Sequence, residues 1–76
     1  TLIYFRDLRP EDPNFRLAQY MGLRGYLPEW NANLHGAIDE GTLQEWSALC
    51  GFKPKAILGK TSRLEVLTMI YKRIRQ

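Results

Sequence analysis

The chain has 76 residues, of which 45% are hydrophobic and 12% aromatic, and a formal net charge of +3. This length allows one modest core, and the composition is that of a folding chain rather than a disordered tail. The single cysteine, Cys50, excludes an internal disulfide and a cysteine-based metal cage. No apolar run approaches the roughly 18 to 20 residues that cross a bilayer. We expect one domain, residues 1–76, cut from a longer protein.

The charge is unevenly distributed along the chain. Residues 1–38 hold four basic and four acidic side chains, residues 39–50 carry −3, and residues 51–76 hold seven basic side chains and one acidic side chain. This basic C-terminal third favours an anionic partner. Lys72, Arg73 and Arg75, however, end a predicted helix, where cations complement the helix dipole without any ligand.

The first predicted helix follows a short apolar run and a turn. Residues 2–5 are strand-like and lead into a loop. Asp12 and Pro13 predict a helix start, with Asp12 as the N-cap and Pro13 in the first turn. Apolar positions 15, 17, 18, 21 and 22 then share one face. Gly25 is expected to end the helix, with Tyr26 folding back on Met21.

The second predicted helix begins after a turn-rich stretch, residues 26–38. Asp39 is its expected N-cap, with Glu40 favourably placed in the first turn. Its predicted buried stripe consists of Leu43, Trp46, Leu49 and Cys50. Gly51 is expected to stop it, with Phe52 as a hydrophobic return contact.

The third predicted helix, Ser62 to about Arg75, follows a basic loop over residues 53–61, in which residues 56–58 form an apolar plug or a short strand. Ser62 and Glu65 have the spacing of a capping box. Arg63 falls at the first helical position, where the helix dipole disfavours a cation. The predicted buried stripe leaves out Met69 and contains Leu64, Val66, Leu67, Ile70, Tyr71 and Ile74. The expected class is therefore mostly α: three helices with aromatic- and Gly/Pro-containing loops, and a short N-terminal strand.

Several of these landmarks resemble the S-layer homology (SLH) module. Phe5-Arg6-Asp7-Leu8 matches its opening, Ala18-x-x-Met21-x-x-x-Gly25-Tyr26 matches its first helix, and Ser62-Arg63-Leu64-Glu65 matches its closing Thr-Arg-Ala-Glu motif. Residues 38–43 look like a second copy of that motif without the arginine. The resemblance implies carbohydrate binding at a bacterial cell surface, and an exported or envelope-associated protein.

Residues 14–28, with Leu43 and Trp46 following, are also similar to C-terminal segments of bacterial FAD-dependent oxidoreductases. Such tails sit behind a flavin-binding domain. The chain itself lacks a Gly-x-Gly-x-x-Gly motif after a strand, so no cofactor is expected in this fragment. The resemblance implies an accessory part of an enzyme.

The candidate ligand-binding residues are Ser62, Arg63 and Glu65, together with the loop aromatics Tyr26 and Trp30. A guanidinium holds a carboxylate or phosphate bidentately, and exposed aromatic rings stack on sugars. The alternative for Arg63 is an internal ion pair with Glu65, Asp39 or Glu40. The alternative for both aromatic residues is core packing, with Tyr26 as the helix-capping contact.

No catalytic residue and no metal ligand is proposed from the sequence. His35 is a lone histidine without a second ligand. Cys50 lies near a predicted helix C-terminus, where the dipole disfavours the thiolate. Capping and exposure account for the acid pairs Asp7 with Asp12 and Glu40 with Glu45.

The sequence therefore predicts a non-catalytic docking or binding module. Its partner would be the remainder of its own polypeptide or an acidic cell-wall or surface polysaccharide. One alternative is a structural part of a flavin oxidoreductase with no ligand of its own. Another is nucleic-acid binding through Lys53, Lys55, Lys60, Arg63, Lys72, Arg73 and Arg75, against which the last helix is largely apolar.

Overall fold

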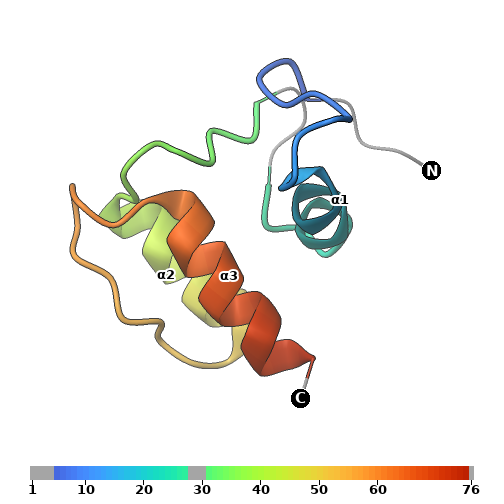
Figure 1. Cartoon of the computed structure of the whole chain (residues 1–76). Helices are drawn as coiled ribbons and strands as arrows, with labels where there is room; N and C mark the ends of the chain where they lie inside the picture. Colours follow the sequence, from blue (N-terminus) through green and yellow to red (C-terminus); the bar gives the residue numbers. More distant parts are fainter. Residues whose placement is uncertain (1–4, 28–30, 76) are drawn as a thin grey trace. The chain divides into compact units, whose positions relative to one another are not determined.

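The computed structural model describes residues 5–27 and 31–75, and within them the chain is mostly α (Figure 1). The described residues form α1 (Phe15–Leu23), α2 (Glu40–Cys50) and α3 (Arg63–Ile74). The three-helix prediction is confirmed. The predicted strand over residues 2–5 lies, apart from Phe5, outside the described part. None of the helices in that part has the length and apolar character needed to span a membrane.

The chain divides into two compact units, Thr1–Asn33 and Leu34–Gln76. In the first unit, α1 ends as predicted. Gly25 adopts a left-handed φ of 92°, and the Tyr26 N–H bonds to the Met21 carbonyl at 3.1 Å. The Gly25 N–H also bonds to the Gly22 carbonyl. These two bonds form the Schellman motif, and both Tyr26 and Met21 are buried.

The start of α1 differs from the prediction. The helix begins at Phe15, with Asn14 as an N-cap that makes no side-chain bond. Asp12 lies two residues earlier, where its carboxylate accepts the Asn14 N–H at 2.8 Å. The Asp12 side chain thus closes a local turn that contains Pro13, and the helix starts only after this turn.

Asp7 connects the two ends of the first unit. Its carboxylate accepts the N–H groups of Ala32 and Asn33 at 2.9 and 2.7 Å. Burial raises the pKa of Asp7, but the N–H donors of Ala32 and Asn33, together with that of Asp7 itself, outweigh burial and hold the pKa below its ordinary value of 3.8. Asn33 itself adopts a φ of 50°, a conformation that asparagine tolerates better than most residues.

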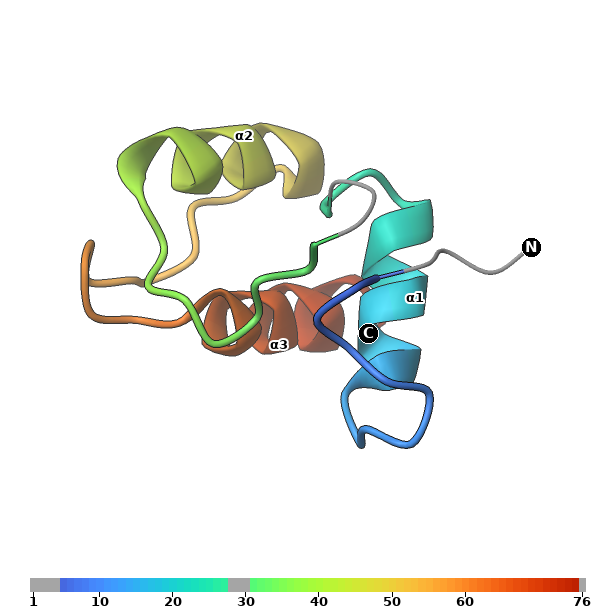
Figure 2. The same cartoon turned by 90° about the horizontal axis from the view of Figure 1, so that it is seen from above.

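In the second unit, α2 and α3 run in the same direction (Figure 1, Figure 2). Residues 51–62 connect them and lead the chain back from the end of α2 to the start of α3. The two helix starts therefore lie at the same end of the unit. Backbone bonds tie this end together: Ile38 N–H to the Thr61 carbonyl, Arg63 N–H to that of Gly36, and Leu64 N–H to that of Leu34. Ala37 and Ser62 form an antiparallel bridge there.

The buried residues of the helices correct parts of the predicted stripes. In α3, Val66, Leu67 and Ile70 are fully buried. Leu64, Tyr71 and Ile74, predicted as core, are only half-buried, as is Met69. In α1, Ala18 and Met21 are buried whereas positions 15, 17 and 22 are half-buried, and the polar Gln19 is buried instead.

Leu49 was predicted to be buried with Leu43 and Trp46, and this is wrong. Leu43 and Trp46 are buried, but Leu49 is 50% exposed. Each step of three residues turns a helix by about 300°, so the apolar stripe drifts by about 60° per step. After two steps from Leu43, Leu49 has reached the edge of the buried face.

Candidate functional site

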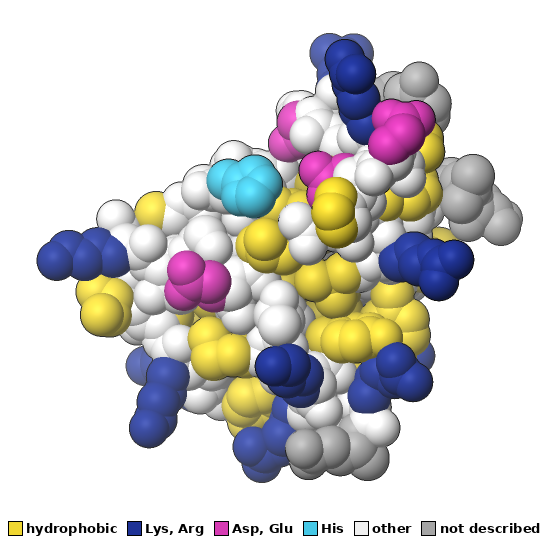
Figure 3. All heavy atoms as spheres, in the orientation of Figure 1, with side chains coloured by type: hydrophobic (Ala, Val, Ile, Leu, Met, Phe, Trp, Pro, Cys, Tyr) yellow, Lys and Arg dark blue, Asp and Glu magenta, His cyan; other side chains and the backbone are white. Residues whose placement is uncertain are grey.

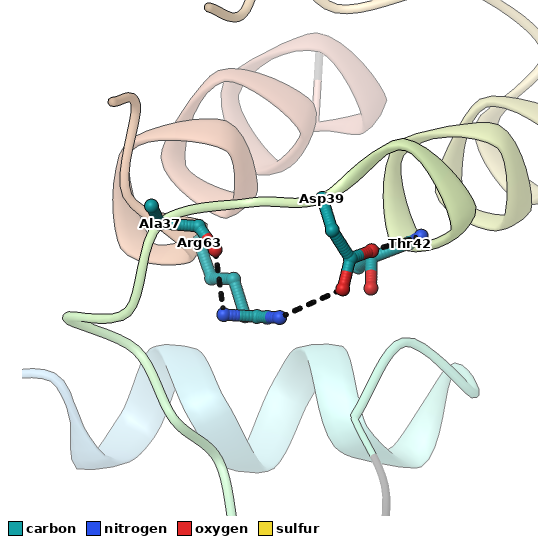
Figure 4. Close-up of polar contacts among 4 residues, drawn as sticks. All are labelled: Ala37, Asp39, Thr42 and Arg63. Carbon is teal, nitrogen blue, oxygen red and sulfur yellow. Dashed lines mark hydrogen bonds and ion pairs between the residues drawn. The ribbon is translucent and has the colours of Figure 1, made fainter. Parts of the chain in front are cut away.

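Arg63 begins α3 and its guanidinium is held by acceptors from the start of the second unit (Figure 4). Nη1 donates to the Ala37 carbonyl at 2.9 Å, and Nη2 lies 3.4 Å from the Asp39 carboxylate. The Arg63 side chain is 16% exposed, against 65% for Asp39. Of the three acidic side chains that the sequence offers as internal partners for Arg63, the structure pairs it with Asp39.

Asp39 interacts with the start of both α2 and α3. As the N-cap of α2, it accepts the Thr42 N–H at 2.7 Å, and this confirms the predicted cap. Its pKa is lowered, first by the backbone and side-chain hydrogen bonds from Thr42 and to a smaller extent by the charge of Arg63. One carboxylate therefore caps α2 and offsets the cation at the start of α3.

The first N–H groups of α3 have no partner within the helix, but other parts of the second unit and the Ser62 cap supply acceptors for them. Ser62 is the N-cap as predicted, and its hydroxyl accepts the Glu65 N–H at 3.2 Å. The Arg63 and Leu64 N–H groups bond to the Gly36 and Leu34 carbonyls at 2.9 and 2.8 Å. Helix N-termini bind anions through such N–H groups, and here the protein itself occupies them.

The capping box is half-formed. The Ser62 hydroxyl makes its bond, but the Glu65 side chain is exposed, and within the described ranges no bond joins it to the Ser62 N–H. Of the other candidates, Tyr26 is buried in the first unit, and Trp30 lies outside the described residues. Ser62, Arg63 and Glu65 thus form one cluster in the second unit.

The remaining candidates take the following places. Trp46 is buried, and His35 is exposed. The half-buried Cys50 donates its thiol to the Phe52 carbonyl at 3.2 Å. Across the described part of the chain, no group of three or more His, Cys, Asp or Glu side chains is arranged to hold a metal ion.

The sequence did not predict a hollow of about 300 Å³ in the second unit. One wall is α2 and the other is the returning segment after it; the lining residues are Glu40, Leu43, Gln44, Ser47, Lys53 and Leu58. Residues 56–58 were expected as an apolar plug or strand. Instead Ile57 and Leu58 are 65% and 47% exposed. Two consecutive large apolar residues in a basic loop were the signal available in the sequence.

Basic side chains gather at the end of the second unit where both helices finish. Lys72 and Arg73 lie in the last turn of α3, and Arg75 is its C-cap. Figure 3 shows Lys and Arg side chains spread over this face, several of them along its lower edge, where Figure 1 places the segment after α2 and the last turn of α3. The Arg73 guanidinium lies 4.7 Å from the centroid of the Phe52 ring, which brings the end of α3 beside the residue preceding Lys53. Arg75 stacks on Tyr71 and donates to its hydroxyl.

Comparison with known proteins found no relative of this chain. No protein-family model matches the chain, and neither the curated proteins nor the solved structures gave a match.

Proposed function

We propose that the chain is a non-catalytic docking module that binds a protein surface, with the remainder of a larger polypeptide as its first partner. The observation that carries this proposal is the exposed pair Ile57 and Leu58 beside the hollow. Large apolar side chains grouped around a concave surface are characteristic of protein contacts. The docking surface consists of the hollow and these two side chains.

The geometry favours this surface over the start of α3. A ligand carboxylate or phosphate at Arg63 would compete with the Ala37 carbonyl and the Asp39 carboxylate for a side chain that is only 16% exposed. It would also meet N–H groups that are already bonded to Gly36, Leu34 and Ser62. Recognition of an acidic polysaccharide through Arg63 would therefore compete with contacts inside the fold, whereas the hollow is open already.

The similarity to C-terminal segments of FAD-dependent oxidoreductases supports one kind of larger polypeptide. In such a protein, the module would pack against the flavin-binding part and take no part in the chemistry. The SLH resemblance supports a cell-envelope protein instead. Both contexts are compatible with docking through an apolar surface.

Hydrogen exchange tests the proposal. We expect backbone amides of residues 53–58 to exchange more slowly in the longer polypeptide than in the 76-residue chain, because docking covers the exposed segment. Amides of residues 63–65 provide the comparison, since they are bonded internally in either context. Equal exchange of residues 53–58 in both proteins would contradict docking through this surface.

A further inference from the structure

The hollow has an apolar wall and a charge at each end. Leu43 and Leu58 face it from α2 and from the returning segment. Glu40 is the first residue of α2, whereas Lys53 lies three residues beyond its last residue, Cys50. Gln44 donates to the Glu40 carboxylate at 3.3 Å, so this pair occupies one end. Lys53 is exposed and, among the described residues, has no hydrogen-bond or ion-pair partner.

The charge around Lys53 exceeds what the helices require. Each helix C-terminus carries roughly half a negative charge, so the two parallel helices place about −1 at this end. Lys53 follows α2 after two further residues, and Lys72, Arg73 and Arg75 end α3, so four positive charges lie at the same end. From residue 46 to residue 76 the one acidic residue is Glu65, which lies in the first turn of α3, at the other end. Helix dipoles alone therefore leave this end strongly positive.

We propose that the hollow binds a protein segment in which an apolar side chain is followed on one side by carboxylates; this inference rests on the proposed docking function. The apolar side chain lies between Leu43 and Leu58. The carboxylates meet Lys53 and the guanidinium of Arg73, which lies over the ring of Phe52, the residue before Lys53. Glu40 at the opposite end repels a second acidic group, so the hollow selects the direction of the segment.

A protein segment fits this surface better than nucleic acid. Nucleic-acid interfaces depend on phosphate contacts and are more polar and more positively charged than protein interfaces. Here two leucines form the wall, and Glu40 faces the hollow, where it would repel a phosphate. Charge complementarity beside an apolar centre is the usual arrangement of a protein interface.

The test is an NMR titration of the 76-residue chain with a blocked peptide in which leucine has two aspartates on one side and two glycines on the other. We expect saturable shifts of the Leu43, Gln44, Ser47 and Leu58 amides. The peptide with lysines in place of aspartates should bind at least about tenfold more weakly. Stronger shifts of these amides by short duplex DNA than by the acidic peptide would overturn the proposal in favour of nucleic acid.

Two charge reversals complete the test. Lys53→Glu should weaken binding of the acidic peptide by about tenfold or more. Lys60→Glu changes the net charge equally, but Lys60 does not line the hollow, so this variant should bind the peptide nearly as wild type does. Equal effects of both variants, or no shifts of the lining amides with the acidic peptide, would overturn the proposal. Protection of residues 53–58 in the longer polypeptide would still stand in that case, so docking and acidic recognition fail separately.

Discussion

At the residue scale, Arg63 stabilises the fold from a position that the sequence marks as unfavourable. Its guanidinium joins the segment before α2 to the start of α3, through the Ala37 carbonyl and the Asp39 carboxylate. The charge is therefore balanced inside the second unit. The sequence indicated that Arg63 needed a nearby carboxylate or a ligand, but it could not select Asp39, because 24 residues separate the two.

We expect Arg63→Ala to lower the free energy of unfolding by about 1 to 2 kcal/mol, because the Ala37 carbonyl loses its donor and a largely buried side chain loses its packing. Urea unfolding followed by circular dichroism measures this change. Lys60→Ala, at an exposed position in the preceding loop, is the control and should change stability by less than about 0.5 kcal/mol. An Arg63→Ala variant as stable as the control would contradict the internal role.

Asp7 and Asp39 make folding sensitive to acid. Both have lowered pKa values, so the folded chain binds protons less readily than the unfolded chain. Their contribution is fully present above the ordinary value of 3.8, and it is lost as the pH falls through the lowered pKa values. We expect Asp39→Asn to be less stable than wild type near neutral pH and to lose less stability on acidification.

Urea unfolding at about pH 7 and about pH 3 measures this difference. Glu45→Gln removes an exposed carboxylate outside the helix caps and serves as the control. Identical acid sensitivity of Asp39→Asn and wild type would show that Asp39 contributes nothing to it.

At the element scale, the helix ends were the most predictable features. Asp39, Ser62 and Gly25 cap helices through bonds to residues within five positions, so their roles depend on local sequence. The exposure of Leu49 could not be predicted from such local bonds. It depends on where the neighbouring elements stop covering α2, and this is set by tertiary packing.

The two members of the predicted capping box should respond differently to substitution. Ser62→Ala removes the acceptor of the Glu65 N–H and should cost about 1 kcal/mol. Glu65→Ala removes the side-chain acceptor of the box and should cost only a few tenths of a kcal/mol, the value of a surface charge near a helix N-terminus. Thermal or urea unfolding measures both, and equal losses would indicate that the box is complete in solution.

Two glycines at opposite ends of α2 provide a comparison. Gly51 follows the helix with a φ of 82°, so Gly51→Ala should destabilise by about 1 kcal/mol or more. Gly41 lies in the first turn, and a Cβ there would meet only Asp39 Oδ1 at 3.8 Å. Gly41→Ala should therefore be neutral or stabilising by up to about 1 kcal/mol. A stabilising Gly51→Ala would contradict the left-handed helix end.

At the scale of the whole molecule, the parallel direction of α2 and α3 could not be predicted from the sequence. Short loops favour antiparallel neighbours, but here residues 51–62 return the chain so that both helices start together. The Leu34 and Gly36 carbonyls that receive the first N–H groups of α3 are more than 25 residues from their donors. Such pairings, and the hollow that the returning segment creates, follow from the tertiary fold alone.

This arrangement separates two basic features that look alike in the sequence. Arg63 lies at the end where the helices start and is held by the fold. Lys53 lies at the end where they finish and lines the hollow. Lys53 is therefore the cation that a partner can reach, whereas Arg63 is engaged within the fold.

The most direct measurement is the affinity of the leucine–aspartate peptide for two variants of the chain, Lys53→Glu and Arg63→Lys, determined by NMR titration. The account predicts that Lys53→Glu weakens binding by about tenfold, whereas Arg63→Lys leaves it within about twofold of wild type. Binding that is lost in Arg63→Lys and retained in Lys53→Glu would place the partner at the start of α3 and contradict the account.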